Sequence, residues 1–437
     1  MDRTRIMEIL SDWNLWGDYD SILHSRPLYL KRIEELFSRK YALILLGIRR
    51  AGKSSLAELF IKDLAEKRII TDKDTLLINL EDPRFPPIID SELLFKIYET
   101  YLAEIGPTDP IIILDEVQKV HDWERFARYL LESRKQRVIV TGSSSKVLDS
   151  EVSDILTGRH VDIEVTPLAL REILDFNDIE LDDLKLFKER NIIQKIFFDY
   201  CIWGGFPEVV LSGSEVVKKE LLNTYFHDIL IKDVVKRFNI SDIPKLESLA
   251  HLYITQISDL ISFNKLKDRL KMSLDTIENY SKYMEKARLF FFLDKFDWSR
   301  WKQIRSQKKV YVSDIGFHTL KGFKFSENRG KVMENIVAIE LMRKRSDGFE
   351  LYYWRDYQDH EIDFVVKKGN RIEKLIQVTS VSSIEDVNMR EHRSLLIGKK
   401  MTDCHDLIII TDDAEGEVEM KDARIRLVPL WKWLLEG

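Results

Sequence analysis

The fold is decided by residues 47–54, Gly-Ile-Arg-Arg-Ala-Gly-Lys-Ser, which have the form G-x-x-x-x-G-K-S. Residues 41–46 before them are a short apolar run that predicts a buried strand, and residues 55–67 after them predict an amphipathic helix. A strand, a glycine-rich loop and a helix in this order indicate a phosphate-binding loop. Glycines let the backbone turn its N–H groups toward the phosphates, and the N-terminus of the helix adds the positive end of its dipole.

The loop therefore predicts a site for a nucleotide with Mg²⁺, and we expect ATP. Lys53 reaches the β- and γ-phosphates, and Ser54 supplies a hydroxyl to Mg²⁺. The predicted nucleotide-binding residues are Gly47, Arg49, Arg50, Ala51, Gly52, Lys53, Ser54 and Ser55, together with Ser143 from a later strand end.

A second motif supplies carboxylates. Residues 111–114 are apolar and predict a buried parallel strand, and Asp115 and Glu116 follow directly. This is a Walker B pattern, in which Asp115 holds Mg²⁺ through water and Glu116 polarises the attacking water. An acidic pair at a helix start can also be mere capping, but its position after the phosphate-binding loop favours the catalytic role.

Arg159 is a candidate for the arginine that stabilises transition-state charge in cis or in trans, although a lone arginine is usually a surface residue. The predicted catalytic residues are Glu116, Lys53 and Arg159, and the predicted metal ligands are Ser54 and Asp115.

Two other predicted strands end in polar residues. Residues 137–140 lead into Thr141 to Ser145, whose hydroxyls can contact the γ-phosphate or the attacking water as a sensor does, or can serve turn chemistry alone. Residues 75–80 lead into Glu81 and Asp82, which are either a solvated strand end or a metal or water contact.

These motifs together resemble the archaeal and bacterial AAA-type ATPases, whose members commonly carry a nuclease-like domain at the C-terminal end. The resemblance covers nearly the whole chain and implies an AAA+-like P-loop core that hydrolyses ATP. The segments that carry it are residues 47–54, 79–83, 114–118 with Trp123, 141–144, 158–159, 167–168, 203–207 and 310–317.

The expected fold class is α/β, with a P-loop parallel sheet followed by a helical lid, a winged helix and a small restriction-endonuclease-like domain. The expected domains are residues 1–170 for the ATPase core, 171–245 for the lid, 246–318 for the winged helix and 319–437 for the nuclease-like domain.

The expected winged helix has a basic wing at residues 295–309, and a predicted recognition helix begins after the N-cap Ser273. Cationic side chains bind phosphates and aromatic side chains stack on bases, so the composition of the wing favours a role in binding nucleic acid. Acidic residues on the recognition helix repel phosphates, so a protein-binding or packing role stays open. The wing contains Lys295, Arg300, Lys302, Arg305, Lys308, Lys309, Trp298 and Trp301, and the acids of the helix are Asp275, Glu278 and Glu285.

The C-terminal segment resembles a PD-(D/E)XK nuclease, with Glu334 and Asp363 at active-site positions. That chemistry needs carboxylates for Mg²⁺ and a lysine that positions water. Gln377 and Thr379 stand where the family has Glu and Lys, so a metal-ligand charge and the lysine are both absent. Lys367 or Lys374 could in principle substitute from nearby, but nothing in the sequence shows that. We therefore expect a degenerate domain that binds nucleic acid or a partner rather than an active nuclease.

Composition narrows the class of protein. The chain has 437 residues, 44% of them hydrophobic, which is room for about three domains with sizeable cores. Its apolar runs are shorter than the roughly 18 residues of a membrane span, and the N-terminus lacks an export profile, so we expect a cytoplasmic protein without membrane contact. A net charge of −6 excludes a globally basic surface, and any DNA contact must be local. Cys201 and Cys404 are expected to be buried free thiols.

The leading hypothesis is a Mg²⁺-dependent ATPase that couples its nucleotide state to the winged-helix and nuclease-like domains, with DNA as a candidate partner through the wing and the C-terminal domain. Two alternatives are an ATP-controlled DNA nuclease and a nucleotide switch that regulates a protein partner. A homo-oligomer is a further expectation, because a neighbouring subunit often supplies the arginine of such sites.

Overall fold

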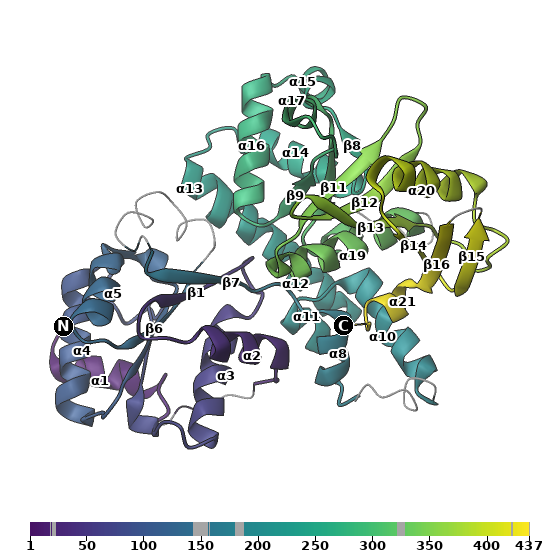
Figure 1. The fold of residues 1–437 in the computed structure, drawn as a ribbon. Coiled ribbons are helices and arrows are strands. Elements are labelled where there is room, and N and C mark those ends of the chain that lie inside the picture. Colours follow the sequence, from purple (N-terminus) through teal and green to yellow (C-terminus); the bar gives the residue numbers. More distant parts are fainter. Residues whose placement is uncertain are drawn as a thin grey trace. The chain divides into compact units, whose positions relative to one another are not determined.

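The computed structural model describes residues 1–17, 19, 23–142, 156, 158–179, 188–320, 328–420 and 423–436. The chain divides into two compact units, Met1–Thr166 and Pro167–Gly437 (Figure 1). Ser143, predicted to contact nucleotide, lies outside the described residues, as do Ser144 and Ser145.

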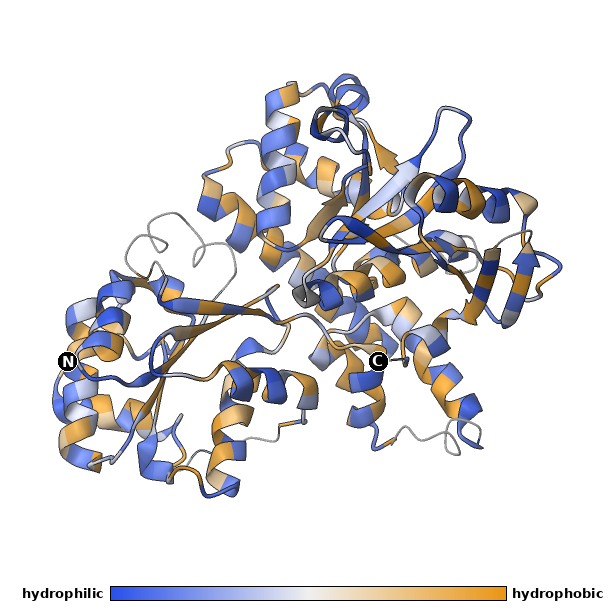
Figure 2. Cartoon of the chain, viewed as in Figure 1, coloured by the Kyte–Doolittle hydropathy of each residue, from blue (hydrophilic) through white to orange (hydrophobic). Residues whose placement is uncertain are grey.

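The first unit is built on a parallel sheet in the order β2-β4-β6-β1-β7. Its inner strands are short aliphatic runs with nearly every residue buried, as expected when helices cover both faces of a parallel sheet. These strands are mostly hydrophobic in Figure 2. The strands are β1 (Ala42–Leu46), β2 (Thr75–Asn79), β4 (Ile111–Asp115), β6 (Arg137–Thr141) and β7 (His160–Glu164).

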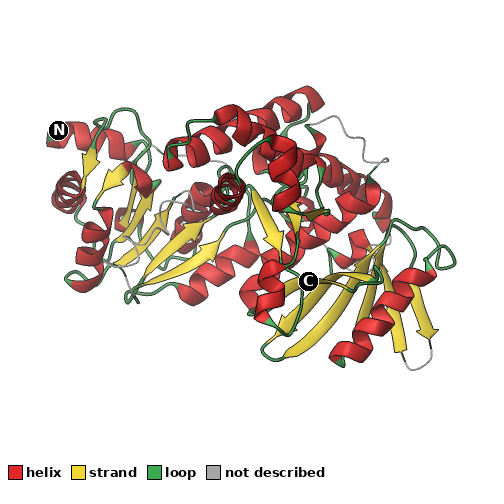
Figure 3. Ribbon diagram, turned by 90° about the horizontal axis from the view of Figure 1, so that it is seen from above, coloured by secondary structure: helices red, strands yellow, loops and turns green. Residues whose placement is uncertain are grey.

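Helices lie along the sheet of the first unit (Figure 3). Successive side chains of a strand point to opposite faces of its sheet. Ile44, Ile112 and Val140 belong to a core that also contains Leu94 and Phe126, which lie on α4 and α5. The helix that follows the glycine-rich loop, α3, packs against β6, and α2 packs on α3. The helices are α1 (Arg3–Ser11), α2 (Pro27–Leu36), α3 (Lys53–Glu66), α4 (Ser91–Ile105) and α5 (Trp123–Glu132), with the short elements η1 (Asp72–Asp74), β3 (Ile89–Asp90), η2 (Val117–Lys119) and β5 (Val120–His121). This is the predicted P-loop NTPase fold.

The second unit begins with a helical segment, as the sequence predicts. The two glycines Gly204 and Gly205 predict a turn between helices, and they lie between α10 and α11, where Gly204 has a left-handed φ of 75°. A Cβ at Gly204 would lie 1.8 Å from the Asp314 carboxylate, so glycine is required there. The elements are α8 (Leu170–Phe176), α10 (Arg190–Trp203), α11 (Pro207–Leu211), α12 (Glu215–Asp228), the π-helical η3 (Ile229–Val235) and α13 (Lys236–Phe238).

The next segment contains three helices and a small sheet in the order β8-β10-β9. Ser273 caps α16 as predicted, because its side chain accepts a hydrogen bond from Thr276 N. The segment between β9 and β10 is not a simple hairpin loop, because residues 300–305 form a helix. The elements are α14 (Ile243–Thr255), β8 (Leu260–Ile261), α15 (Phe263–Leu270), α16 (Leu274–Lys286), β9 (Phe290–Leu293), α17 (Arg300–Arg305), β10 (Lys308–Val312) and α18 (Gly316–Thr319).

The chain ends in a mixed sheet in the order β11-β12-β13-β14-β16-β15. Helix α20 packs on β12 and β13, and α19 contacts both β13 and β10 (Figure 1). The elements are α19 (Arg329–Arg343), η4 (Lys344–Asp347), β11 (Glu350–Arg355), β12 (Glu361–Lys368), β13 (Arg371–Val378), α20 (Met389–Thr402), β14 (Asp406–Thr411), β15 (Gly416–Met420), β16 (Ala423–Pro429) and α21 (Leu430–Trp433).

Cys201 and Cys404 are buried free thiols, as predicted. Within the described ranges, no helix is long and apolar enough to cross a membrane.

Candidate functional site

The candidate site lies at the carboxyl edge of the first sheet. Strand β1 ends at the glycine-rich loop, β4 ends at Asp115, and β6, which ends at Thr141, pairs with both of them. Because the three strands are parallel, their carboxyl ends meet at one edge. The predicted loop and the predicted acidic pair are thus brought together, with Thr141 between them.

Hydrogen bonds join these strand ends. Ser54 Oγ donates to Asp115 Oδ1 over 2.7 Å, and Thr141 Oγ1 donates to the same oxygen over 2.5 Å. The backbone N–H of Glu116 donates to Thr141 Oγ1 over 3.1 Å. Thr141 therefore fixes both members of the acidic pair, a role more specific than the sensor contact proposed from its place at a strand end.

The loop conformation depends on glycine at two positions. Gly52 has a left-handed φ of 88° immediately before α3. A Cβ at Gly47 would lie 2.0 Å from the backbone oxygen of Val165. The Lys53 ammonium is buried and donates to the carbonyl oxygens of Gly47 and Ile48, each over 3.2 Å. Lys53 therefore curls over its own loop, where phosphates would bind.

The two carboxylates differ in environment. Burial, and then the neighbouring Glu116 charge, raise the pKa of Asp115 to about 6, while bonds from Ser54 and Thr141 oppose that rise. Glu116 has a left-handed φ of 59°, which is uncommon for a residue with a Cβ and typical of functional turns. Gln118 Nε2 donates to Glu116 Oε2 and holds that carboxylate in place.

The ligands that this edge offers fit Mg²⁺. The Ser54 hydroxyl and the Asp115 carboxylate converge to 2.7 Å, and hydroxyl and carboxylate oxygens are the ligands that this hard cation prefers. A cation there would also offset the cost of a buried Asp115 charge. The sequence predicts both residues as metal ligands, and that role stays a prediction.

The acids after β2 have structural partners. Glu81 lies within ion-pair distance of Arg49, at 3.9 Å, and of Lys119, at 3.8 Å. Asp82 is neither solvated nor directed to a metal, because it is buried and accepts hydrogen bonds from Arg84 and Trp13. These bonds, the Arg84 bond foremost, lower the pKa of Asp82 to about 2.

One residue near the loop has no sequence motif. The buried Arg26 donates to Ala51 O over 3.1 Å and to Thr166 O over 3.0 Å, and its guanidinium lies 4.4 Å from the Tyr29 ring centroid. It therefore connects the loop to the segment after β7. Arg26 lies outside every sequence motif, so the sequence alone does not predict that it contacts the loop.

Arg159 is not brought to the loop within one chain. Its backbone oxygen accepts from the N–H of Ala42, the first residue of β1, so it lies at the opposite edge of the sheet. At about 3.3 Å per residue, that edge is about 16 Å from the loop. Its guanidinium pairs with Glu132 at 2.7 Å. The predicted role in cis is wrong, and a role in trans stays a prediction.

A second cluster lies in the C-terminal sheet and brings together Glu334 and Asp363, as the sequence predicts. The cation between them is Lys309 of β10, rather than Lys367 or Lys374, which pair with Glu350 and Asp406. Lys309 was predicted to be a cation of the wing, but it is only 1% exposed, because the β10 backbone directs it inward. His360, which precedes β12, is also buried and pairs with Asp356.

Three family descriptions match successive parts of the chain. An "AAA domain" covers residues 39–174, and two domains of unknown function, DUF8612 and DUF4143, cover residues 194–325 and 329–433. The first description fits the P-loop at residues 47–54.

Similar whole proteins are also known. An uncharacterized protein of Methanocaldococcus jannaschii is 32% identical over 405 residues, which cover 90% of this chain and 88% of that protein. An uncharacterized protein of Haemophilus influenzae is 25% identical over 420 residues, covering 94% and 98%.

Solved structures are more distant. The Aeropyrum pernix Orc1 protein in complex with DNA is 13% identical, covers 75% of this chain and 97% of its own, and has a TM-score of 0.30. Cdc6p from Pyrobaculum aerophilum is 14% identical, covers 77% and 98%, and has a TM-score of 0.29.

Proposed function

We propose, from the premise that this chain belongs to the family of its Methanocaldococcus jannaschii relative and carries an AAA domain, that it hydrolyses ATP with Mg²⁺. The observation that carries the proposal is the Ser54–Asp115–Thr141 hydrogen-bond network, which joins the phosphate-binding loop to the acidic pair. In this proposal the nucleotide state controls residues 167–437.

In this proposal each residue of the site has its own role in binding or hydrolysing ATP. Backbone N–H groups of the loop and the Lys53 ammonium would bind the phosphates, and Ser54 and Asp115 would hold Mg²⁺. Bound Mg²⁺ would supply positive charge against the phosphate oxygens. Glu116, held by Gln118 and by its backbone bond to Thr141, would orient the attacking water and accept its proton.

Lys53 gives the first test, by nucleotide binding. We expect Lys53→Ala to lose Mg²⁺-ATP affinity by tenfold or more, because the phosphates lose a buried cation. Lys67→Ala is the matched control, since Lys67 ends the same helix but lies half exposed beside Asp63. Equal ATP affinity in wild type and Lys53→Ala, measured by fluorescence titration, would show that the nucleotide binds elsewhere.

A DNA-directed role is the second part of the proposal, and α17 with its flanks supports it. Trp298 is 62% exposed and Trp301 is 72% exposed, and Arg300, Lys302 and Arg305 lie between or beside them. Cationic side chains bind the phosphates of nucleic acids, and exposed aromatic rings stack on the bases of single strands. The order α14-α15-α16-β9-β10 supports a winged helix behind this surface. A protein partner is the alternative that the same exposed aromatics leave open.

The C-terminal segment is proposed to be nuclease-like in fold. Its order α19-β11-β12-β13-α20-β14 supports that proposal. The predicted domain limits at residues 170, 245 and 318 remain part of the proposal, as does a homo-oligomer in which Arg159 would reach a neighbouring site.

A further inference from the structure

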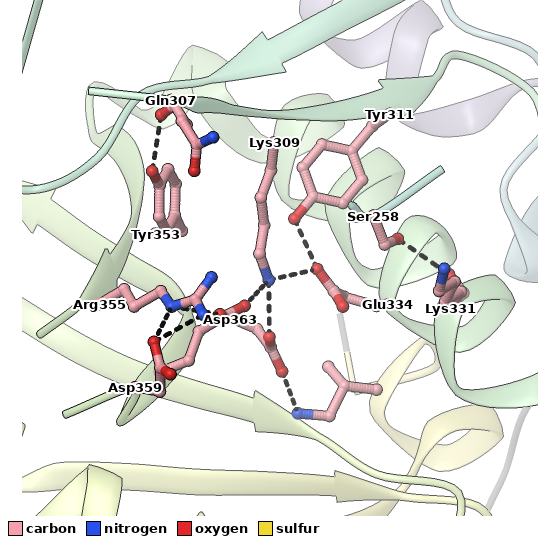
Figure 4. A network of polar contacts seen from close by, with 12 residues as sticks. Ser258, Gln307, Lys309, Tyr311, Lys331, Glu334, Tyr353, Arg355, Asp359 and Asp363 are labelled. Carbon is pink, nitrogen blue, oxygen red and sulfur yellow. Dashed lines mark hydrogen bonds and ion pairs between the residues drawn. The ribbon is translucent and has the colours of Figure 1, made fainter. Parts of the chain in front are cut away.

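The C-terminal acid cluster is centred on a lysine from another sheet. Lys309 lies on β10 of the sheet β8-β10-β9, whereas Glu361 and Asp363 lie on β12 and Glu334 lies on α19. In Figure 4 the Lys309 side chain runs between the rings of Tyr353 and Tyr311 toward the carboxylates of Glu334 and Asp363. The side chain of Lys309 is 2% exposed, so its charge is almost entirely removed from water.

The Lys309 ammonium has a carboxylate partner for each of its three N–H donors. Lys309 Nζ lies 2.9 Å from Glu334 Oε1, 2.6 Å from Glu361 Oε1 and 2.8 Å from Asp363 Oδ1. A lysine ammonium has three N–H donors, and three different carboxylates meet it here. Burial alone would lower the pKa of Lys309, but the charges of Asp363, Glu334 and Glu361 raise it well above its ordinary value.

The carboxylates are also positioned by the rest of the chain. Tyr311 Oη donates to Glu334 Oε1 over 2.7 Å, and the Val378 N–H donates to Asp363 Oδ2 over 2.9 Å. An extra residue in β12, between the partners of Tyr352 and Trp354, breaks the strand alternation where Asp363 lies. Such a bulge redirects a side chain. The cluster is therefore built to hold a cation at one point.

A divalent metal would need the same oxygens. Mg²⁺ binds carboxylate oxygens at about 2.0 to 2.1 Å and carries two charges. The Lys309 ammonium already occupies the point where the three carboxylates converge, and two adjacent cations there would repel each other in a medium of low dielectric constant.

We propose that Lys309 is the resident cation of this cluster, so that its ammonium replaces a divalent metal and Glu334, Glu361 and Asp363 bind none. On the proposed nuclease-like fold, the segment keeps two acids of the nuclease site, Glu334 and Asp363, and uses them with Glu361 to join β10 to β12 and α19. The inference is independent of ATP hydrolysis, since all of its residues lie in the second unit.

The test is a titration of the nucleotide-free full chain with Mn²⁺. The electron paramagnetic resonance signal of free Mn²⁺ measures how much of the added ion stays unbound. Every variant carries Asp115→Asn, which removes the only carboxylate among the two predicted metal ligands of the first unit, Ser54 and Asp115. We expect no Mn²⁺ site at the cluster while Lys309 is present. Lys309→Ala should gain one site, and added Asp363→Asn should remove it again.

Lys308→Ala is the matched control, because Lys308 precedes Lys309 on β10 but pairs with Asp294 at 2.8 Å and is 37% exposed. This control should gain no site. Tight Mn²⁺ binding that depends on Asp363 while Lys309 is intact would overturn the proposal, and so would a folded Lys309→Ala that gains no site.

Poor folding of Lys309→Ala would also be informative, because it would leave three carboxylates without their cation. In that case we expect thermal stability to be restored by Mn²⁺ or by adding Asp363→Asn with Glu361→Gln. If neither restores stability, Lys309 acts through packing alone and the proposal fails.

Discussion

At the scale of single residues, Thr141 is the contact on which the geometry of the acidic pair depends. Its hydroxyl donates to Asp115 and accepts from the Glu116 N–H. We expect Thr141→Ala to lower kcat for ATP by about 5- to 150-fold, since leaving such buried groups unpaired costs about 1 to 3 kcal/mol. Thr141→Ser keeps the hydroxyl and should retain most turnover. Equal loss in both variants, measured by phosphate release, would assign Thr141 a packing role.

The buried Asp314 carboxyl should make the stability of the folded chain depend on pH. It is buried and accepts hydrogen bonds from the N–H groups of Gly205 and Gly316, over 2.8 and 2.9 Å. Burial raises its pKa from 3.8 to about 6, despite these two bonds. The folded chain therefore holds a proton that the unfolded chain loses near pH 4, so this group's stabilisation falls as pH rises from about 4 to about 6.

Asp314→Asn cannot titrate, so it isolates this effect. The shift corresponds to about 3 kcal/mol, at about 1.4 kcal/mol per pKa unit. We expect wild type to be more stable than Asp314→Asn at low pH, and this difference to shrink by up to that amount between about pH 4 and pH 7. Urea unfolding at several pH values measures it. A difference that stays constant with pH would mean that Asp314 is ionised throughout.

The sequence predicted residues whose roles belong to a local motif. Lys53, Ser54, Asp115 and Glu116 lie in two short patterns, and the parallel sheet brings those patterns together. Arg26 and Lys309 could not be predicted, because their roles depend on contacts with residues far away in the chain. Lys309 looked like one wing cation among several, and only the direction of its side chain from β10 shows otherwise.

At the scale of elements, α20 lies unusually close to the C-terminal sheet at Gly398. A Cβ there would lie 2.4 Å from Ile362 Cδ1 and 2.9 Å from Leu375 Cδ1, and both side chains are fully buried. We expect Gly398→Val to lower the free energy of unfolding by about 1 to 3 kcal/mol, the usual cost of overpacking.

Gly213 offers the control for this substitution. It is exposed, and nothing lies within 4 Å of the position of its Cβ. Gly213→Val should change stability by less than about 0.5 kcal/mol. Denaturant unfolding of the two variants compares them directly. A Gly398→Val chain as stable as wild type would mean that α20 moves freely away from β12 and β13.

Elements with strong patterns were predicted well, and those with weak patterns were not. The aliphatic runs predicted β1, β4 and β6 to within a residue at each end. The sequence does not predict strand β7, because it lies at the edge of the sheet and only Ile163 among its five residues is buried. The pattern of residues 384–397 predicts a helix that begins at Ile384. Helix α20 begins later, at Met389, because Asn388 caps it and the residues before it form turns.

At the scale of the whole molecule, the proposed DNA contact through α17 has a measurable electrostatic signature. Arg300 is exposed beside Trp301, and reversal of its charge would repel phosphates. We expect Arg300→Glu to weaken DNA binding and to reduce the slope of log affinity against log salt by about one. Lys219→Glu on α12 is the control for net charge and should leave the slope unchanged. Identical slopes in all three proteins, by fluorescence anisotropy, would direct the search to a protein partner.

The most direct test of the central claim is ATP turnover by wild type and Glu116→Gln, measured together with ATP affinity. Glutamine keeps the size of Glu116 but cannot accept the proton of the attacking water. We predict that Glu116→Gln binds Mg²⁺-ATP as wild type does and loses at least about 99% of kcat, a cost of about 2.7 kcal/mol in the barrier. Undiminished turnover by Glu116→Gln would contradict the account.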